Sequence, residues 1–233
     1  MSQDHLEKVF KLLTHWRRYP NYQLERRADI FFAANMEPIL YTACGQFELD
    51  ILIPEFPLRK GFIYPELDKD AQQRNRSVKV DYLCVDKARQ RCLLVELKTD
   101  DSSVRPDQMD AMRKGQCHSL SALLTDLEEL RRHSAQAHKY RALLEDLDSK
   151  GLLELGPDGR IRKEAPSISP KPELIFIKPT KEFRKAEEQL LKEGDVVIDF
   201  DQVRNALGPY CGQDPLAALF SQALKDWSGT DKN

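Results

Sequence analysis

The chain has 233 residues, of which 41% are hydrophobic and 32% charged, and its formal net charge at pH 7 is −2. This composition excludes a disordered polymer, and no apolar run approaches the ~18 residues of a transmembrane helix. The charge excludes a cationic field over the whole molecule, so any contact with nucleic acid must use a local basic surface or a metal ion. Residues 1–5 lack the apolar region of a signal peptide, so we expect the chain in the cytoplasm.

The first half of the chain changes from helical to strand-like patterns. Apolar residues recur at helical spacing over 4–16 and again over 24–43, where Pro38 predicts a kink or a restart. Three strands are expected after them, at 47–58, 78–85 and 92–98. The third is almost continuously apolar, which suits a central strand covered on both faces. Because only a short link separates the second strand from the third, we expect these two to form an antiparallel hairpin.

The second half adds helices and further strands. An amphipathic helix is predicted from Pro106 to about Leu130. The later elements expected are a helix at 137–147, a hairpin at 152–155 and 160–162, a strand at 173–177, a helix at 181–191, a strand at 196–200 and a helix at 215–227. This order predicts an α/β fold around a mixed sheet. We expect one domain over 1–233, with an N-terminal helix in 1–20, a core in 21–200 that carries an insertion at about 115–172, and a C-terminal helical extension in 201–233.

Three charged residues interrupt the apolar second and third strands. Asp81 lies within the second strand, while Glu96 and Lys98 end the third. Side chains alternate along a strand, so Glu96 and Lys98 point to the same face. Opposite charges on an otherwise apolar face need a reason, because removing a charge from water is costly unless the charge is paired.

Two explanations of these charges stay open. If the hairpin brings Asp81 beside Glu96, two carboxylates repel one another, and Mg²⁺ with water and substrate phosphate is the natural third partner. Lys98 would then contact the nucleophilic water or the phosphate and offset charge in the transition state. The alternative is a salt bridge of Lys98 with Asp81 or with Glu96 at the rim of the sheet.

The pattern Asp81…Glu96-Leu97-Lys98, on the second and third strands of this element order, resembles the PD-(D/E)xK nuclease superfamily. The resemblance spans roughly residues 24–177, and Val80 stands where the motif has proline. It implies a restriction-endonuclease-like mixed sheet with an αβββαβ core and helical additions at both ends. It also implies that Asp81, Glu96 and the Leu97 carbonyl bind the metal and that Lys98 is the catalytic lysine.

Members of this superfamily often add an acidic residue from the first core helix. We choose Glu37 as an additional metal ligand, because its helical neighbours are apolar, over Glu25, whose neighbours indicate a solvated face. Three residues are candidates for nucleic-acid binding. Gln108 opens the helix that follows the strand ending at Lys98, and Arg105 and Lys114 are candidate phosphate contacts. The stretch 59–91 is richer in base than in acid and is either a phosphate-attracting surface or a solvated edge.

The function expected is Mg²⁺-dependent hydrolysis of phosphodiester bonds in DNA by metal-activated water, with Mn²⁺ as a substitute. The alternative is a catalytically silent module that keeps the nuclease fold and binds nucleic acid or protein. A homodimer is left open, and no membrane partner is expected.

Overall fold

The computed structural model of the chain describes residues 3–70, 72–88, 90–100, 105–164, 170–182 and 191–228. The chain folds into two compact units. Unit 1 comprises Met1–Leu49, Glu96–Val104 and Ile175–Asn233, and unit 2 comprises Asp50–Val95 and Arg105–Leu174. The predicted division into a core, an insertion and an extension stays a prediction. Among the described residues, no helix is both long and apolar enough to cross a bilayer.

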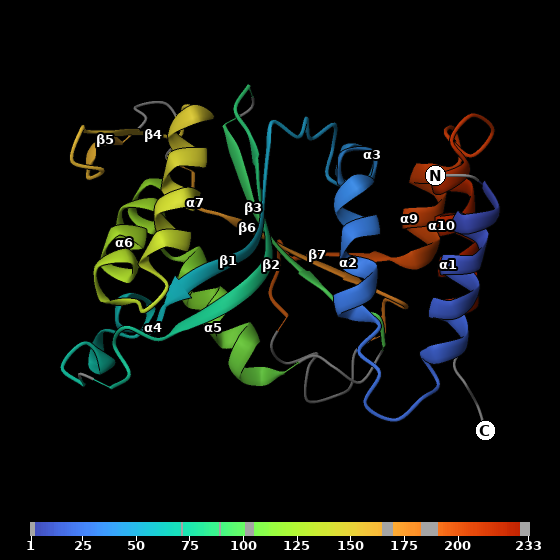
Figure 1. Cartoon of the computed structure of the whole chain (residues 1–233), viewed down its shortest axis with the longest axis horizontal. Helices are drawn as coiled ribbons and strands as arrows, with labels where there is room; N and C mark the ends of the chain where they lie inside the picture. The colour runs from blue at the N-terminus through green and yellow to red at the C-terminus, as the bar shows by residue number, and fades with distance from the viewer. Residues whose placement is uncertain are drawn as a thin grey trace. The chain divides into compact units, whose positions relative to one another are not determined.

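Unit 1 is mainly helical. Its helices are α1 (Gln3–Trp16), α2 (Glu25–Ala34), α3 (Met36–Ala43), α9 (Phe200–Leu207) and α10 (Pro215–Ser228). Helix α1 lies along α10, and α9 contacts both α3 and α10 (Figure 1). Large aromatic rings fill the space among these helices. Phe220 packs edge-to-face on Phe32 with ring centroids 4.9 Å apart, and its ring also neighbours that of the buried Trp227.

One predicted helix of unit 1 is divided into two in the structure. The helix at 4–16 is confirmed as α1, whereas the stretch 24–43 is divided at Asn35 and not at Pro38. Asn35 leaves the helical conformation, and its amide donates to the Phe31 carbonyl at 2.8 Å. Pro38 falls in the first turn of α3, where the missing N–H costs nothing. The predicted helix at 181–191 falls largely outside the described residues.

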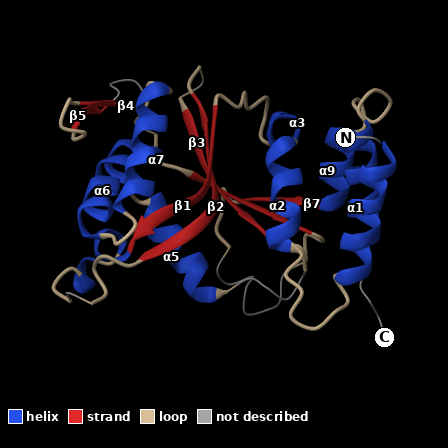
Figure 2. Cartoon of the chain, in the orientation of Figure 1, coloured by secondary structure: helices blue, strands red, loops and turns tan. Residues whose placement is uncertain are grey.

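Unit 2 combines long strands with helices. Its elements are β1 (Ile51–Arg59), α4 (Lys60–Ile63), the 3₁₀ turn η1 (Pro65–Leu67), β2 (Ser77–Asp86), most of β3 (Arg91–Leu97), α5 (Pro106–Gln116), α6 (Leu120–His133), α7 (Ala137–Ser149), β4 (Leu153–Leu155) and β5 (Ile161–Glu164). Figure 2 shows β1 and β2 side by side, with α5 next to them. The single helix predicted from Pro106 is wrong, since α5 ends at Gln116 and Ser119 begins α6 as an N-cap, its hydroxyl accepting from the Ala122 N–H at 3.2 Å.

A five-stranded mixed sheet has the strand order β1-β2-β3-β6-β7, which confirms the predicted α/β class. Strand β2 pairs antiparallel with β1 and with β3, so the expected hairpin is confirmed. Strand β6 (Glu173–Lys178) runs parallel to β7 (Val196–Asp199). Strands β3 and β6 each pass from unit 2 into unit 1, at Glu96 and at Ile175. The separate pairing of β4 with β5 confirms the small hairpin predicted at 152–162.

Candidate functional site

The end of β3 and the residue after it carry two opposite charges inside unit 1. The side chains of Glu96 and Lys98 are only 2% and 6% exposed, and Lys98 Nζ lies 2.5 Å from Glu96 Oε1. The backbone of Lys98 is fixed as well, because its N–H donates to the Ile177 carbonyl of β6 at 2.8 Å. The alternation predicted from the strand pattern therefore holds, and the two charges share one buried face.

A second carboxylate reaches the same lysine from α2. Glu25, the first residue of that helix, has its Oε2 3.3 Å from Lys98 Nζ, and its side chain is half-buried. We call Glu25, Glu96 and Lys98 the Lys98 cluster. It holds one ammonium group and two carboxylates, so its formal charge is −1 when all three groups are ionised.

The structure places the two candidate acids of the first core helix differently, and the choice of Glu37 as an additional metal ligand stays a prediction. Glu37 is exposed in α3, whereas Glu25 contacts Lys98. Sequence reasoning treated 24–43 as one helix, so it placed Glu37 on the apolar face; the break at Asn35 means that residues on its two sides do not continue one face. The signal that was available is Leu24, which is buried directly before Glu25 and ties the first turn of α2 to the core.

Asp81 lies in unit 2, within β2, and is half-buried. The next residue, Tyr82, pairs with Val95 of β3 in the antiparallel register. Asp81 therefore comes directly before one member of this pair along the chain, and Glu96 comes directly after the other. Their predicted convergence on a metal ion, together with the Leu97 carbonyl, stays a prediction.

The three candidate nucleic-acid contacts lie at or on α5 in unit 2. Gln108 is half-buried, and its amide donates to the Lys79 carbonyl of β2 at 3.3 Å, which fixes the start of α5 against that strand. Arg105 is the residue before α5, and it is exposed, as is Lys114 near the end of the helix. Gln108 thus has a structural task, while the two cations are accessible to solvent. Binding of nucleic acid by any of the three stays a prediction.

Two basic residues of the stretch 59–91 are engaged within unit 2. Arg59 is largely buried and meets the buried Asp126, with Nε 2.8 Å and Nη2 2.6 Å from the same Oδ1 atom. Burial raises the pKa of Asp126, and the hydrogen bond from Arg59 only partly opposes this effect. Arg91 forms two 2.8 Å hydrogen bonds with Glu173. These two arginines hold unit 2 together, so the predicted phosphate-attracting surface does not include them.

One buried lysine was missed by the sequence reasoning. Lys178, the last residue of β6, is 1% exposed, and its ammonium donates to the Glu182 carbonyl. The available signal is the same as for Lys98, namely a lysine that ends an almost continuously apolar strand. Lys178 belongs to unit 1, one residue after the Ile177 carbonyl that receives the Lys98 N–H.

Among the residues that the structure describes, no group of three or more His, Cys, Asp or Glu side chains is arranged to hold a metal ion. No protein-family model, curated protein or solved structure matches the chain. The nuclease resemblance therefore depends on this chain's own residues.

Proposed function

We propose that the protein is a Mg²⁺-dependent phosphodiesterase acting on DNA, with a restriction-endonuclease-like core of the PD-(D/E)xK type. The observation that carries the proposal is the Lys98 cluster. A lysine and a glutamate two residues before it are both buried at the end of a central strand, and a second glutamate reaches the same lysine. This arrangement supports the proposal because it holds a lysine charge in a fixed position beside a glutamate at the end of the strand, as the PD-(D/E)xK motif requires.

The register of the hairpin supports the inclusion of Asp81. Residues directly opposite each other in an antiparallel pair have their side chains on the same face, roughly 4.5–5.5 Å apart at Cβ in general. Tyr82 pairs with Val95, and along the chain Asp81 comes directly before Tyr82 and Glu96 directly after Val95. This position next to one pair of the ladder supports counting both carboxylates in the proposed site.

The donor set fits magnesium by its chemistry. Mg²⁺ is usually bound through one or two carboxylates, with water and substrate phosphate completing its six ligands, so three preassembled acidic side chains are not required. Asp81, Glu96 and the Leu97 carbonyl would hold it, and neither histidine nor cysteine, the ligands typical of zinc, belongs to the set. When bound, the ion would act as a Lewis acid beside the scissile phosphate.

The protein's own residues would position and shield the charges. Glu25 and Glu96 hold the Lys98 ammonium group from two sides, so that its charge is already oriented before a phosphate arrives. Because the ammonium is almost fully shielded from water, its attraction for a phosphoryl oxygen is stronger than that of a solvated lysine. We assign Lys98 to charge stabilisation at the phosphate and Glu25 to the positioning of Lys98.

The test is cleavage of supercoiled plasmid and of single-stranded DNA, with Mg²⁺ and with excess EDTA. The wild type should cut in Mg²⁺ and not in EDTA, and Lys98→Met, which keeps the apolar length of the side chain, should lose about a hundredfold or more in rate. Lys139→Met removes an exposed lysine of α7, which belongs to no proposed site, and should cut within about twofold of the wild-type rate. Cleavage that persists in EDTA, or full activity of Lys98→Met, would contradict the proposal.

One observation favours the catalytically silent module as a second candidate. The 2.5 Å contact of Lys98 with Glu96 already neutralises the more buried carboxylate of the Lys98 cluster without any metal ion. Calorimetric titration with Mg²⁺ or Mn²⁺ separates the two candidates. A nuclease should bind the ion, and Asp81→Asn or Glu96→Gln should weaken binding, whereas a silent module should show no specific heat at this site.

A further inference from the structure

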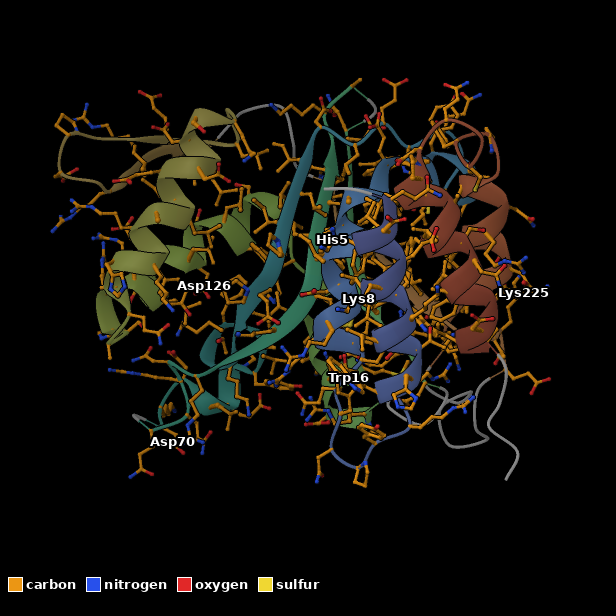
Figure 3. The ribbon with its side chains drawn as sticks, turned by 45° about the vertical axis from the view of Figure 1, so that its right-hand side comes forward. His5, Lys8, Trp16, Asp70, Asp126 and Lys225 are labelled. Atoms are coloured by element: carbon orange, nitrogen blue, oxygen red, sulfur yellow. The ribbon has the colours of Figure 1, made fainter. Side chains whose placement is uncertain are left out.

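The turn between α1 and α2 exposes large aromatic side chains, which is unusual for a surface without a partner. Trp16 and Tyr19 are 38% and 50% exposed, and Tyr22 is half-buried. Trp16 lies at the C-terminal end of α1 (Figure 3). All of these residues belong to unit 1. The feature therefore stands within a single compact part of the molecule.

Arginines alternate with these aromatic residues. Between His15 and Ile30 the sequence carries four arginines but only two carboxylates, although the whole chain is slightly acidic. Arg18, Arg26 and Arg27 are all exposed. We call the exposed residues Trp16, Arg18, Tyr19, Arg26 and Arg27 the aromatic-basic turn. It is a local cationic surface of the kind that a chain without a global positive field needs in order to contact nucleic acid.

The turn is held by hydrogen bonds and ring contacts of its own. Its backbone is closed by hydrogen bonds from the Tyr19 N–H to the Trp16 carbonyl at 2.8 Å and from the Tyr22 N–H to the Tyr19 carbonyl at 3.2 Å. The rings support one another, since Trp16 meets Tyr22 in a T-shaped contact with centroids 6.1 Å apart, and the Tyr19 hydroxyl contacts His15 Nε2 at 2.8 Å. Side chains that are already ordered lose less entropy when a ligand binds.

The aromatic-basic turn is joined directly to the proposed catalytic cluster. Arg26 and Arg27 follow Glu25, whose carboxylate contacts Lys98. A groove of about 430 Å³ between α1 and α10 also borders the turn, but Glu7 and Asp226 line it beside Lys11 and Arg18. Acidic side chains oppose a polyanion, so the groove is the poorer place for one, and the exposed turn is the better.

We propose that the aromatic-basic turn binds single-stranded nucleic acid, with bases stacked on Trp16 and Tyr19 and phosphates paired with Arg18, Arg26 and Arg27. Stacked aromatic residues combined with cations are how proteins hold single strands without reading their sequence. In a duplex the bases are already stacked on one another and offer no free face to these rings. The inference builds on the proposed function by naming a single-stranded segment as the substrate class.

The test is fluorescence anisotropy with a labelled oligo(dT) of roughly 15 nucleotides, a length within the range that such sites cover. Excess EDTA prevents Mg²⁺-dependent cleavage during the measurement. Trp16→Ala and Tyr19→Ala should each weaken binding by about tenfold. The matched control is Tyr210→Ala, which removes a tyrosine of nearly equal exposure (51%) elsewhere in unit 1 and should leave binding unchanged.

The charge contribution is measured separately through its dependence on salt. An Arg26→Ala/Arg27→Ala variant should bind more weakly and lower the slope of log affinity against log salt by about 0.7 for each phosphate that is no longer neutralised. Arg141→Ala, on an exposed arginine of α7 in unit 2, is the control. An abasic oligonucleotide of the same length keeps the phosphates but not the bases, so it should bind about as weakly to the wild type as oligo(dT) binds to Trp16→Ala.

Several outcomes would overturn the inference. The first is equal affinity for duplex and single-stranded DNA, and the second is unchanged oligo(dT) binding by both aromatic variants. The third is a protein that binds phosphatidylserine vesicles through these same residues but does not bind oligo(dT). Thermal unfolding of each variant shows whether a loss reflects misfolding. Failure of the proposed function is distinguishable, because a protein that binds oligo(dT) through these residues but never cleaves supports the turn and removes the nuclease.

Discussion

Unit 1 and unit 2 each bury a cation against carboxylates, and they do so in different ways. In unit 2 the planar guanidinium of Arg59 directs two N–H groups to one oxygen of Asp126, and a third nitrogen lies 3.4 Å from the Arg74 carbonyl. In unit 1 the Lys98 ammonium is a point charge held between Glu96 and Glu25. Asp126, the carboxylate that pairs with Arg59, lies on α6 and is labelled in Figure 3.

The difference lies in charge balance and geometry. The Arg59–Asp126 pair is neutral in its buried part, and the rigid fork of arginine is largely used by oxygens of the protein. The Lys98 cluster is negative, and lysine is more compact and less directional. We infer that unit 2 uses its buried ion pair to fix β1 against α6, whereas unit 1 keeps charge that a ligand can complement.

The largest expected effect separates these two roles by activity. Glu96→Gln removes one charge and a proposed metal ligand, so Mg²⁺-dependent DNA cleavage should fall by about a thousandfold. Asp126→Asn makes the corresponding acid-to-amide change at another buried carboxylate and should keep cleavage within about threefold per folded molecule. The measurement is the initial rate of plasmid nicking, corrected for the folded fraction by circular dichroism. Equal losses in both variants would mean that cleavage reports only on stability.

The second prediction compares stability. Removing one partner of a buried ion pair leaves the other charge uncompensated, at a cost of about 3–5 kcal/mol. Of the carboxylates that the structure describes, Arg59 would keep only the exposed Asp68, whose Oδ1 lies 3.6 Å from Arg59 Nη1, so Asp126→Ala should lower the free energy of unfolding by about 3 kcal/mol, the lower end of this range, with no response to Mg²⁺. Lys98→Met should also destabilise the protein in EDTA, but Mg²⁺ should restore part of the loss, because the ion replaces the missing positive charge. Denaturant unfolding with and without Mg²⁺ measures both effects, and a Lys98→Met protein that ignores Mg²⁺ would favour the silent module.

The two charged clusters also differ in how much of them could be predicted from the sequence. The strands and the β2–β3 hairpin were predictable, because alternation and a short link determine them locally. The expectation that Glu96 and Lys98 share one face followed from the same local rule, which did not decide the partner of Lys98. Arg59 and Asp126 are 67 residues apart, and no local pattern connects them. Glu25 was assigned to a solvated face because a helical face can be assigned to the core only when the helix ends are known. The end of α2 at Asn35 has no proline or glycine that would have predicted it.

The third prediction tests the helix that carries Asp126. The Ser119 hydroxyl caps α6 by accepting from the Ala122 N–H. Ser119→Ala leaves that N–H without its cap, and this should lower the free energy of unfolding by about 1 kcal/mol. Ser119→Asn keeps a capping oxygen and should stay close to the wild type. Urea unfolding of the two variants measures the difference, and equal stability of Ser119→Ala and Ser119→Asn would show that the cap contributes nothing to α6.

The smallest expected effect concerns pH, and it originates in His118 of unit 2. Its ring packs against that of Phe62 in a tilted contact, with centroids 4.2 Å apart. Burial lowers the pKa of His118, Lys171 adds to the decrease, and the nearby Asp126 partly opposes it. A histidine whose pKa is lower in the folded than in the unfolded state binds fewer protons when folded, so its contribution to stability is full above the unfolded pKa of about 6.5 and decreases as the pH falls below that value.

The wild type should therefore lose more stability than His118→Gln between pH 8 and pH 5.5. Urea unfolding at both pH values gives the two differences, and the comparison between variants removes the common contribution of Asp126, whose raised pKa acts in the opposite direction. A larger loss in His118→Gln than in the wild type would mean that the charged imidazolium is favoured in the folded state, through Asp126, and that this corner of unit 2 tolerates a net charge much as the Lys98 cluster does.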